Sequence, residues 1–321
     1  MAHLLVAMIP AVSLLCAVAC GSSGSGGTSG DPFAGAELYV DPGSSAARAA
    51  AGLRDSRPDD AAELDKIARN SQADWFGDWD SVATLTQTVA ARRRTIRAAG
   101  ALPVFVVYDI PLRDCHGNSG GGATSPSAYR LWIRNFVAGL ARGSAAVIVE
   151  PDALAQLGCL RPGQRTTRLA LLRYAVRTLA SQEGTAVYLD AGHAGWVPVR
   201  AMAERLRDAG VADARGFSLN VSNFDATAGE QAYGRAISSK VHGRHFVIDT
   251  SRNGLGPGDG WCNPPGRALG HRPTGATGHA RADAYLWIKP PGESDGPCNG
   301  GPQAGEWWTA YAVGLAERAR W

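Results

Sequence analysis

The sequence predicts a single α/β domain, a distorted β/α (TIM-like) barrel of seven to eight parallel strands. From residue 31 onward, short and almost continuously apolar runs alternate with longer amphipathic segments rich in Ala, Leu and Arg. Apolar runs of this kind are typical of parallel strands buried on both faces, with helices as crossovers. Seven or eight such units favour a closed barrel over a doubly wound sheet.

Eight segments are expected to form the strands, spaced so that most neighbours leave room for a helix. They are residues 37–40, 73–76, 102–110, 145–150, 186–190, 216–221, 245–249 and 284–288. Helices are expected over 81–100, 126–143 and 168–184, and the chain ends in a further helical segment, 306–321.

The amino-terminal segment is typical of a targeting signal. Residues 4–20 carry no charge and fall short of the roughly 20 residues of a membrane span, so they fit a signal peptide better. Small residues at 17–19 match a cleavage pattern, and Cys20 follows directly, which leaves either a lipid-modified cysteine or a free one. The protein is therefore expected to be secreted or tethered to the cell envelope. The expected organisation is a signal peptide over 1–20, a Gly/Ser-rich linker over 21–34 and a catalytic body over 35–321.

Charge and cysteine content narrow the class further. The 321 residues include 32 Lys+Arg and 29 Asp+Glu, without a run of five like charges, so a nucleic-acid partner is not expected. Four cysteines lie in the body, an even set that indicates two disulfides in an exported protein. Of three connectivities, Cys115–Cys159 with Cys262–Cys298 is preferred, because each bond would staple a long loop. Neither C-x-x-C nor H-E-x-x-H occurs, and no metal or organic cofactor is expected.

Acidic residues recur just beyond the expected strand ends, the positions that face the active site of a β/α barrel. They include Asp78, Asp114, Asp152, Asp190, Asp249 and Asp295. A single carboxylate there can cap the next helix, a reasonable alternative for Asp78 and Asp249. The whole ring would instead crowd negative charge around one mouth. Such crowding raises some carboxyl pKa values and suits acid/base catalysis.

Tryptophans accompany the same strand ends, at Trp75, Trp79, Trp196, Trp261 and Trp287. Indole faces stack on the apolar faces of sugar rings, while carboxylates bind the hydroxyls. Hydrolysis of a glycoside needs one protonated carboxyl for the leaving oxygen and an opposite group that activates water or attacks the sugar. The pattern therefore predicts a protein that handles polysaccharide.

Five ordered motifs make the prediction specific. They are Y-x-x-P-x-R-D-C at 108–115, V-I-V-E-P-D at 147–152, Y-L-D-A-G-H-x-x-W at 188–196, W-C-N-P-P-G-R at 261–267 and K-P-P-G-E-S-D-G at 289–296. Together they resemble glycoside hydrolase family 6, cellulases that cut β-1,4-glucan with inversion, over about residues 35–321. The resemblance implies a cellulase that acts on cellulose, a related β-glucan or cello-oligosaccharides; the short body favours an endoglucanase, and a monomer is expected.

The resemblance also implies roles for individual positions. Asp152 matches the general acid, Asp114 an auxiliary aspartate that keeps this acid protonated, and Asp295 the proposed base, for which water-relay schemes compete. Sugar-binding positions are matched by Tyr108, His193, Trp196, Trp261, Lys289, Glu293 and either Asn220 or Asn223. Trp75 and Asp78 complete the expected substrate-binding set, and a buried structural histidine is the alternative for His193. The same two disulfides are implied.

One departure from the family pattern concerns the water that attacks the sugar. The serine expected six residues after the auxiliary aspartate is Gly120, so either Ser119 positions the water or the water network is altered. Two alternatives to an endoglucanase stay open: a cellobiohydrolase with exo action, and a non-catalytic glucan-binding or envelope protein. The short body leaves little room for tunnel-forming loops, and the intact aspartate set argues against a non-catalytic protein.

Overall fold

The computed structural model describes Met1 and residues Gly30–Trp321, so the expected signal peptide, Cys20 and most of the linker lie outside the described residues. Seven parallel strands form one sheet in the order β2-β4-β5-β6-β7-β8-β9. Their bounds are β2 Asp74–Gly77, β4 Val104–Tyr108, β5 Ala145–Val149, β6 Thr185–Asp190, β7 Gly216–Leu219, β8 His245–Asp249 and β9 Ala282–Leu286. The edges approach each other, since the Ala73 amide donates to the Trp287 carbonyl over 3.0 Å. The predicted distorted barrel is confirmed.

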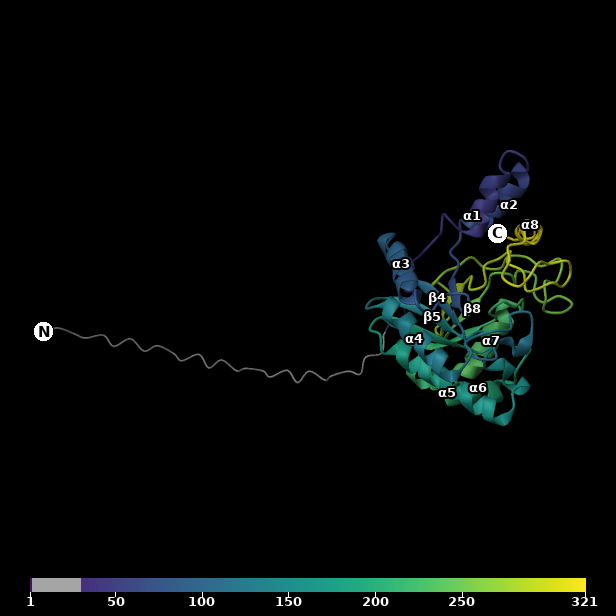
Figure 1. The fold of residues 1–321 in the computed structure, drawn as a ribbon. Helices are drawn as coiled ribbons and strands as arrows, with labels where there is room; N and C mark the ends of the chain where they lie inside the picture. Colours follow the sequence, from purple (N-terminus) through teal and green to yellow (C-terminus); the bar gives the residue numbers. More distant parts are fainter. Residues whose placement is uncertain (2–29) are drawn as a thin grey trace.

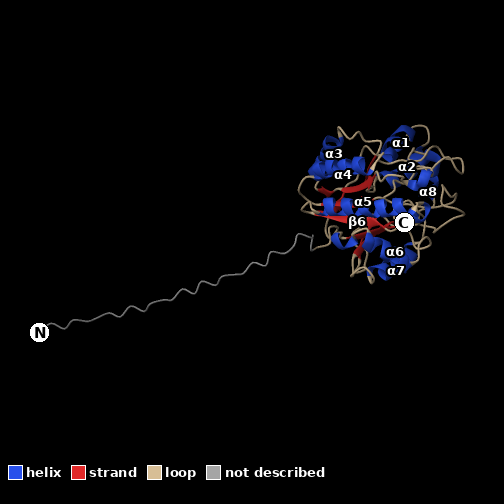
Figure 2. Cartoon of the chain, turned by 60° about the horizontal axis from the view of Figure 1, so that its bottom comes forward, coloured by secondary structure: helices blue, strands red, loops and turns tan. Residues whose placement is uncertain are grey.

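Helices cover the outside of the sheet, and Figures 1 and 2 show α4 to α7 along it. The covering helices are α3 Leu85–Ala98, α4 Pro126–Leu140, α5 Pro162–Ala180, α6 Val199–Asp208 and α7 Thr227–Ser238. Strand residues alternate between two cores, as period-two side chains must. Phe105 and Val107 of β4 pack outward with Phe136 of α4, whereas Val106 and Tyr108 face the barrel interior.

Local signals explain where these helices begin and end. The Ser125 hydroxyl accepts a hydrogen bond from the Ala128 amide over 3.1 Å, and Pro126 occupies the first turn of α4. The helix stops at Leu140 because Ala141 has a positive φ of 49°. The expected segment 126–143 is therefore correct apart from its last three residues.

The expected first strand does not join the barrel. Its residues form β1 (Glu37–Leu38), which pairs with β3 (Ala101–Leu102) in a separate two-stranded sheet. Pro103 divides β3 from β4, because proline has no amide hydrogen to donate to a ladder. The expected strand 102–110 is thus two short strands in different sheets, and seven strands, not eight, enter the barrel.

Helices from the two ends of the described chain pack together. They are α1 Ser45–Leu53, α2 Pro58–Ala68 and α8 Thr309–Glu317, which lie on the same side of the sheet in Figure 1. Their core includes Leu64, Ile67, Leu315 and Trp287. Trp287 therefore stabilises this helical layer and does not contact a cleft, contrary to its expected place among the sugar-facing tryptophans. Among the described residues, no helix is long and apolar enough to cross a membrane.

Candidate active site

A cleft of about 1080 Å³ opens at the carboxyl ends of the strands. Nearly all of the predicted site residues line it: Trp75, Tyr108, Asp114, Ser119, Asp152, His193, Trp196, Asn223, Trp261, Lys289, Glu293 and Asp295. Trp75 and Tyr108 lie in β2 and β4, and the others come from the loops that follow β4 to β9. The strand-end positions inferred from the sequence therefore do converge on one place.

Two predicted substrate contacts, Asp78 and Asn220, lie outside the cleft lining. The Asp78 carboxylate accepts hydrogen bonds from Arg113 Nη1 (2.9 Å) and from the Gly122 amide (2.8 Å), so it clamps the loop after β4. Asn220 is completely buried, and its amide donates to the carbonyls of Asp225 and Asp249. Asn223 is the asparagine that reaches the cleft.

The helix-capping alternative is also wrong for Asp78 and Asp249. The residue that precedes α3 is Thr84, whose side chain makes no cap hydrogen bond. Asp249, at the end of β8, accepts from the backbone amides of Ser251 (2.9 Å), Lys289 (3.0 Å) and Ser222 (3.1 Å). This buried carboxylate therefore ties together the loops after β7, β8 and β9, below the cleft floor.

The surroundings of Asp152 favour a protonated carboxyl. It follows β5 in a left-handed conformation with φ 68°, and its amide donates to Asp190 Oδ2 over 2.8 Å. Its Oδ1 is buried and has no hydrogen-bond partner. Burial, followed by the charges of Asp190, Asp114 and Asp295, raises the pKa of the Asp152 carboxyl well above its usual range. Such a shift favours the protonated carboxyl, the form that can act as a general acid.

Asp190 supports Asp152 directly. Its carboxylate accepts hydrogen bonds from the Asp152 amide, the Gly192 amide (3.0 Å) and the Ser218 hydroxyl (2.9 Å). Burial raises its pKa to about 6 despite these three donors. The pairing follows from β5 and β6 being neighbours, which places the end of one strand against the loop after the other.

Asp114 is anchored to the segment that follows Asp152. Gln156 Nε2 donates to Asp114 Oδ1 over 2.7 Å, and the Ser119 amide donates to Oδ2 over 2.9 Å. Asp114 opens the short helix η1 (Asp114–His116), Gln156 lies on η2 (Ala155–Cys159), and the Cys115–Cys159 disulfide joins the two. Gln156 was missed from the sequence, because a lone glutamine in a turn carries no motif.

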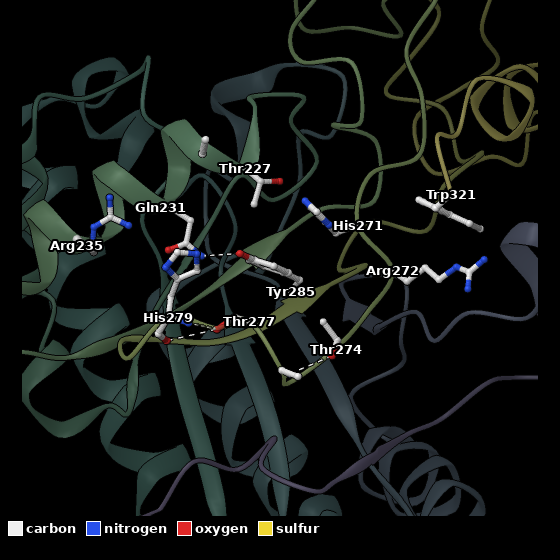
Figure 3. A pocket seen from close by; sticks show the side chains of 12 residues that line it. Thr227, Gln231, Arg235, His271, Arg272, Thr274, Thr277, His279, Tyr285 and Trp321 are labelled. Atoms are coloured by element: carbon white, nitrogen blue, oxygen red, sulfur yellow. Dashed lines mark hydrogen bonds between the residues drawn. The ribbon is translucent and has the colours of Figure 1, made fainter.

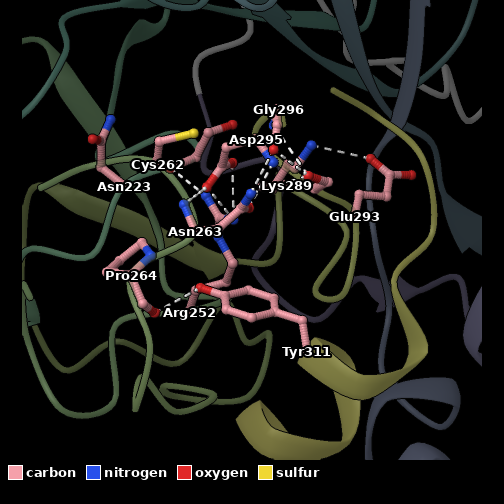
Figure 4. A network of polar contacts seen from close by, with 12 residues as sticks. Asn223, Arg252, Cys262, Asn263, Pro264, Lys289, Glu293, Asp295, Gly296 and Tyr311 are labelled. Carbon is pink, nitrogen blue, oxygen red and sulfur yellow. Dashed lines mark hydrogen bonds and ion pairs between the residues drawn. The ribbon is translucent and has the colours of Figure 1, made fainter. Parts of the chain in front are cut away.

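Asp295 forms a buried ion pair within a network of polar contacts (Figure 4). Arg252 Nη1 lies 2.9 Å from Asp295 Oδ1, and the Asn263 amide donates to Oδ2 over 3.0 Å. Arg252 is itself completely buried, so the pair is screened from water. The second disulfide, Cys262–Cys298, brackets this network as expected. Arg252 was also missed, since nothing in the sequence marks a buried arginine.

Aromatic side chains flank these carboxyls. Trp79, Trp196 and Trp261 line the cleft and are 57%, 38% and 59% exposed, so their indole faces are open to a ligand. Deeper in the cleft, the edge of Trp75 meets Tyr108 at 5.2 Å between ring centroids. Lys289 Nζ lies 3.3 Å from Glu293 Oε2, and both residues line the cleft.

A second pocket, of about 900 Å³, lies on the outer side of β9 (Figure 3). Residues from α7, from the irregular β8–β9 connection and from the carboxyl end line it, among them Arg235, Arg272 and Trp321. None of its twelve lining residues is Asp or Glu. It therefore lacks the carboxyl groups that glycoside hydrolysis needs, and the strand-end cleft is the candidate active site.

A β/α barrel whose strand ends carry clustered carboxyls and exposed tryptophans is the arrangement found in glycoside hydrolases. The particular family follows from comparison with known proteins: the model of "Glycosyl hydrolases family 6" matches residues 33–319, and the chain belongs to this family. Endoglucanase A of Cellulomonas fimi is 47% identical over 288 residues, which are 88% of this chain and 62% of that protein. The chain thus spans less than two thirds of this relative's length.

Solved structures agree with this assignment. The endoglucanase Cel6 of Mycobacterium tuberculosis, in complex with a methyl cellobiosyl-thio-cellobioside, is 51% identical with a TM-score of 0.86, over 90% of this chain and 99% of that one. The catalytic core of the cellobiohydrolase Cel6A of Chaetomium thermophilum is 29% identical with a TM-score of 0.77, over 91% and 99%.

Proposed function

We propose that the protein is an endo-β-1,4-glucanase that hydrolyses internal bonds of cellulose or a related β-glucan with inversion. The observation that carries the proposal is the environment of Asp152, a carboxyl that keeps its proton inside a cleft otherwise rich in carboxylates. The endoglucanases of Cellulomonas and Mycobacterium support this activity, and the cellobioside bound to the latter supports the substrate class.

The proposed reaction is a single displacement. Asp152 donates its proton to the glycosidic oxygen as the bond from this oxygen to the anomeric carbon breaks. A water molecule attacks the same carbon from the opposite face and loses a proton to Asp295, directly or through a second water. Asp114 repels a second negative charge in the cleft and so favours the protonated state of Asp152. Ser119, whose amide holds Asp114, is the candidate that positions the water.

Internal rather than terminal cleavage is favoured by the exposure of the flanking indoles. Trp79 and Trp261 are more than half exposed, whereas a tunnel would cover the rings that stack on the chain. An open cleft admits a polymer at any point along its length. In carboxymethylcellulose the viscosity should then fall faster than reducing ends accumulate. Steady release of cellobiose with little loss of viscosity would instead support exo action.

The general acid provides the decisive test. Asp152→Ala should reduce hydrolysis of cellulose by at least about a thousandfold while cello-oligosaccharide binding is largely kept. Glu204→Gln, an exposed carboxylate on α6, serves as a control that should leave turnover unchanged. Near-normal turnover by Asp152→Ala would refute the mechanism, and an inactive wild type that still binds glucan would favour the non-catalytic alternative.

Export and association are further parts of the proposal. Two disulfides support an oxidising compartment, outside the cytoplasm. Mass spectrometry of the mature amino terminus would distinguish a lipid-modified Cys20, and hence a membrane tether, from a freely secreted form. Light scattering at micromolar concentration should show a monomer.

A further inference from the structure

Beside the cleft, three side chains with metal-binding atoms come together from separate segments. His193 lies in the loop after β6, Asp225 precedes α7, and Glu230 belongs to the first turn of α7. One nitrogen or oxygen atom from each lies within 4.8 Å of the others. The proposed hydrolytic mechanism uses neither the Asp225 nor the Glu230 carboxyl. The proximity of these two groups to His193 therefore needs a separate explanation.

Glu230 supplies an independent observation. Its side chain is completely buried, and Oε1 accepts a hydrogen bond from the Ala194 amide over 2.9 Å. Its Oε2, equally buried, has no partner. Because an unpaired buried carboxylate oxygen is costly, a ligand bound to this oxygen would stabilise the folded protein.

The distance between His193 and Asp225 fits a cation as well. His193 Nδ1 lies 3.0 Å from Asp225 Oδ2, yet it has no partner in hydrogen-bond alignment. A separation of about 3 Å is also that of two adjacent ligand atoms around an ion when bonds of about 2.1 Å meet at a right angle. The pair is therefore arranged as two neighbouring ligands would be.

The cluster has no fixed positive charge beside it. Among the described residues, no lysine or arginine forms an ion pair with Asp225, Glu230 or the nearby Asp190. Without an ion, protons offset part of the negative charge: burial raises the pKa of Glu230 to about 7, and Asp225 raises the pKa of His193 against the effect of burial. A divalent cation would displace these protons and neutralise the two carboxylates.

We propose that His193, Asp225 and Glu230 bind a divalent transition-metal ion, such as Zn²⁺ or Mn²⁺. One imidazole nitrogen with two carboxylates suits these ions better than Ca²⁺ or Mg²⁺, which prefer oxygen ligands alone. The ion takes no part in bond cleavage, and the site does not depend on the proposed function. Coordination through Nδ1 leaves Nε2 of His193 available to the cleft that this residue lines, with the ring fixed in one orientation.

The test uses the full mature chain without a histidine tag, freed of metal with a chelator. Calorimetric titration with Zn²⁺ and with Mn²⁺ should show one ion bound per chain, and the ion should raise the thermal unfolding midpoint. Asp225→Asn and Glu230→Gln should each weaken binding by at least about tenfold. Gln at position 230 can still accept from the Ala194 amide, so the fold is kept.

Glu204→Gln is the matched control, since it removes an exposed carboxylate from α6 and should bind the ion like the wild type. The absence of saturable one-to-one binding to the wild type would overturn the proposal, as would unchanged affinity in both site variants. Either result would mean that the cluster holds protons only.

Discussion

At the scale of single residues, chemically identical side chains acquire opposite properties from their surroundings. Asp152 has a buried oxygen without a partner and three carboxyl neighbours, so it favours the protonated form. Asp295 instead forms an ion pair with the Arg252 guanidinium and accepts a hydrogen bond from the Asn263 amide. The proposed acid and the proposed base thus have different surroundings in one cleft.

Removal of the Arg252 charge should expose how much Asp295 depends on it. Arg252→Met leaves a buried carboxylate unpaired, so we expect a loss of about 3–5 kcal/mol in the free energy of unfolding, measured with urea. The double variant Arg252→Met/Asp295→Asn removes both charges and should recover part of this loss. If the double variant is no more stable than the single one, the ion pair is not the cause.

A second residue-scale prediction concerns Asp109, just below the cleft. Its side chain is buried and its Oδ1 has no partner; burial, followed by the charge of Glu150, raises its pKa to about 8. The folded state binds a proton on the Asp109 carboxyl more tightly than the unfolded state does. The stability that this proton contributes is therefore complete below about pH 4. That contribution is lost as the pH rises through about 8.

Asp109→Asn keeps the shape of the side chain and cannot ionise. We expect the variant to gain about 4 kcal/mol relative to the wild type between pH 5 and pH 9, measured by urea unfolding. Glu204→Gln should show no such gain. Parallel pH profiles for Asp109→Asn and the wild type would contradict the prediction.

At the scale of elements, each disulfide secures the loop of one functional aspartate. Cys115 follows Asp114 directly and is bonded to Cys159 at the end of η2. Cys262 precedes Asn263, which exchanges backbone and side-chain hydrogen bonds with Asp295, and Cys298 lies three residues beyond that aspartate. These loops have little regular structure of their own, so the covalent bonds restrict them.

Loss of the first disulfide should therefore affect both stability and rate. Cys115→Ser/Cys159→Ser opens a loop with a sequence separation of 44 residues and should cost about 2–4 kcal/mol in urea unfolding. We also expect kcat on a cello-oligosaccharide to fall more than KM rises, since the charge of Asp114 contributes to the raised pKa of Asp152. Unchanged stability and kcat would show that the hydrogen bond to Gln156 is sufficient.

At the scale of the whole molecule, the cleft is assembled across the width of the sheet. Asp152 follows β5 and Asp295 follows β9, with β6, β7 and β8 between these strands. The proposed inversion requires the two carboxyls to reach a bound glucan from different sides, with room between them for the attacking water.

This arrangement predicts the configuration of the product. Proton NMR spectra of fresh hydrolysate, recorded before mutarotation, should show the new reducing end in the α configuration. A β product would require a covalent intermediate and would refute the single displacement. Cellobiose dissolved under the same conditions gives the rate of mutarotation as a control.

Much of the fold was predictable because its signals are local. Runs such as Val104–Tyr108 and Ala145–Val149 are apolar throughout, which indicates strands buried on both faces. Glu37–Leu38 misled the strand count, since a short apolar run does not reveal which partner it pairs with. Helices α1 and α2 were not predicted, because the partner that buries their apolar faces, α8, lies at the other end of the chain.

The candidate site also has some features that are predictable from the sequence and others that are not. The sequence by itself determined that carboxyls and indoles stand at strand ends, because strand ends are marked by local changes in polarity. Only the tertiary structure decided that Asp190 holds the Asp152 amide, that Arg252 pairs with Asp295, and that His193 meets Glu230. Hydrogen bonding and burial depend on contacts between residues dozens of positions apart, and no spacing along the chain encodes them.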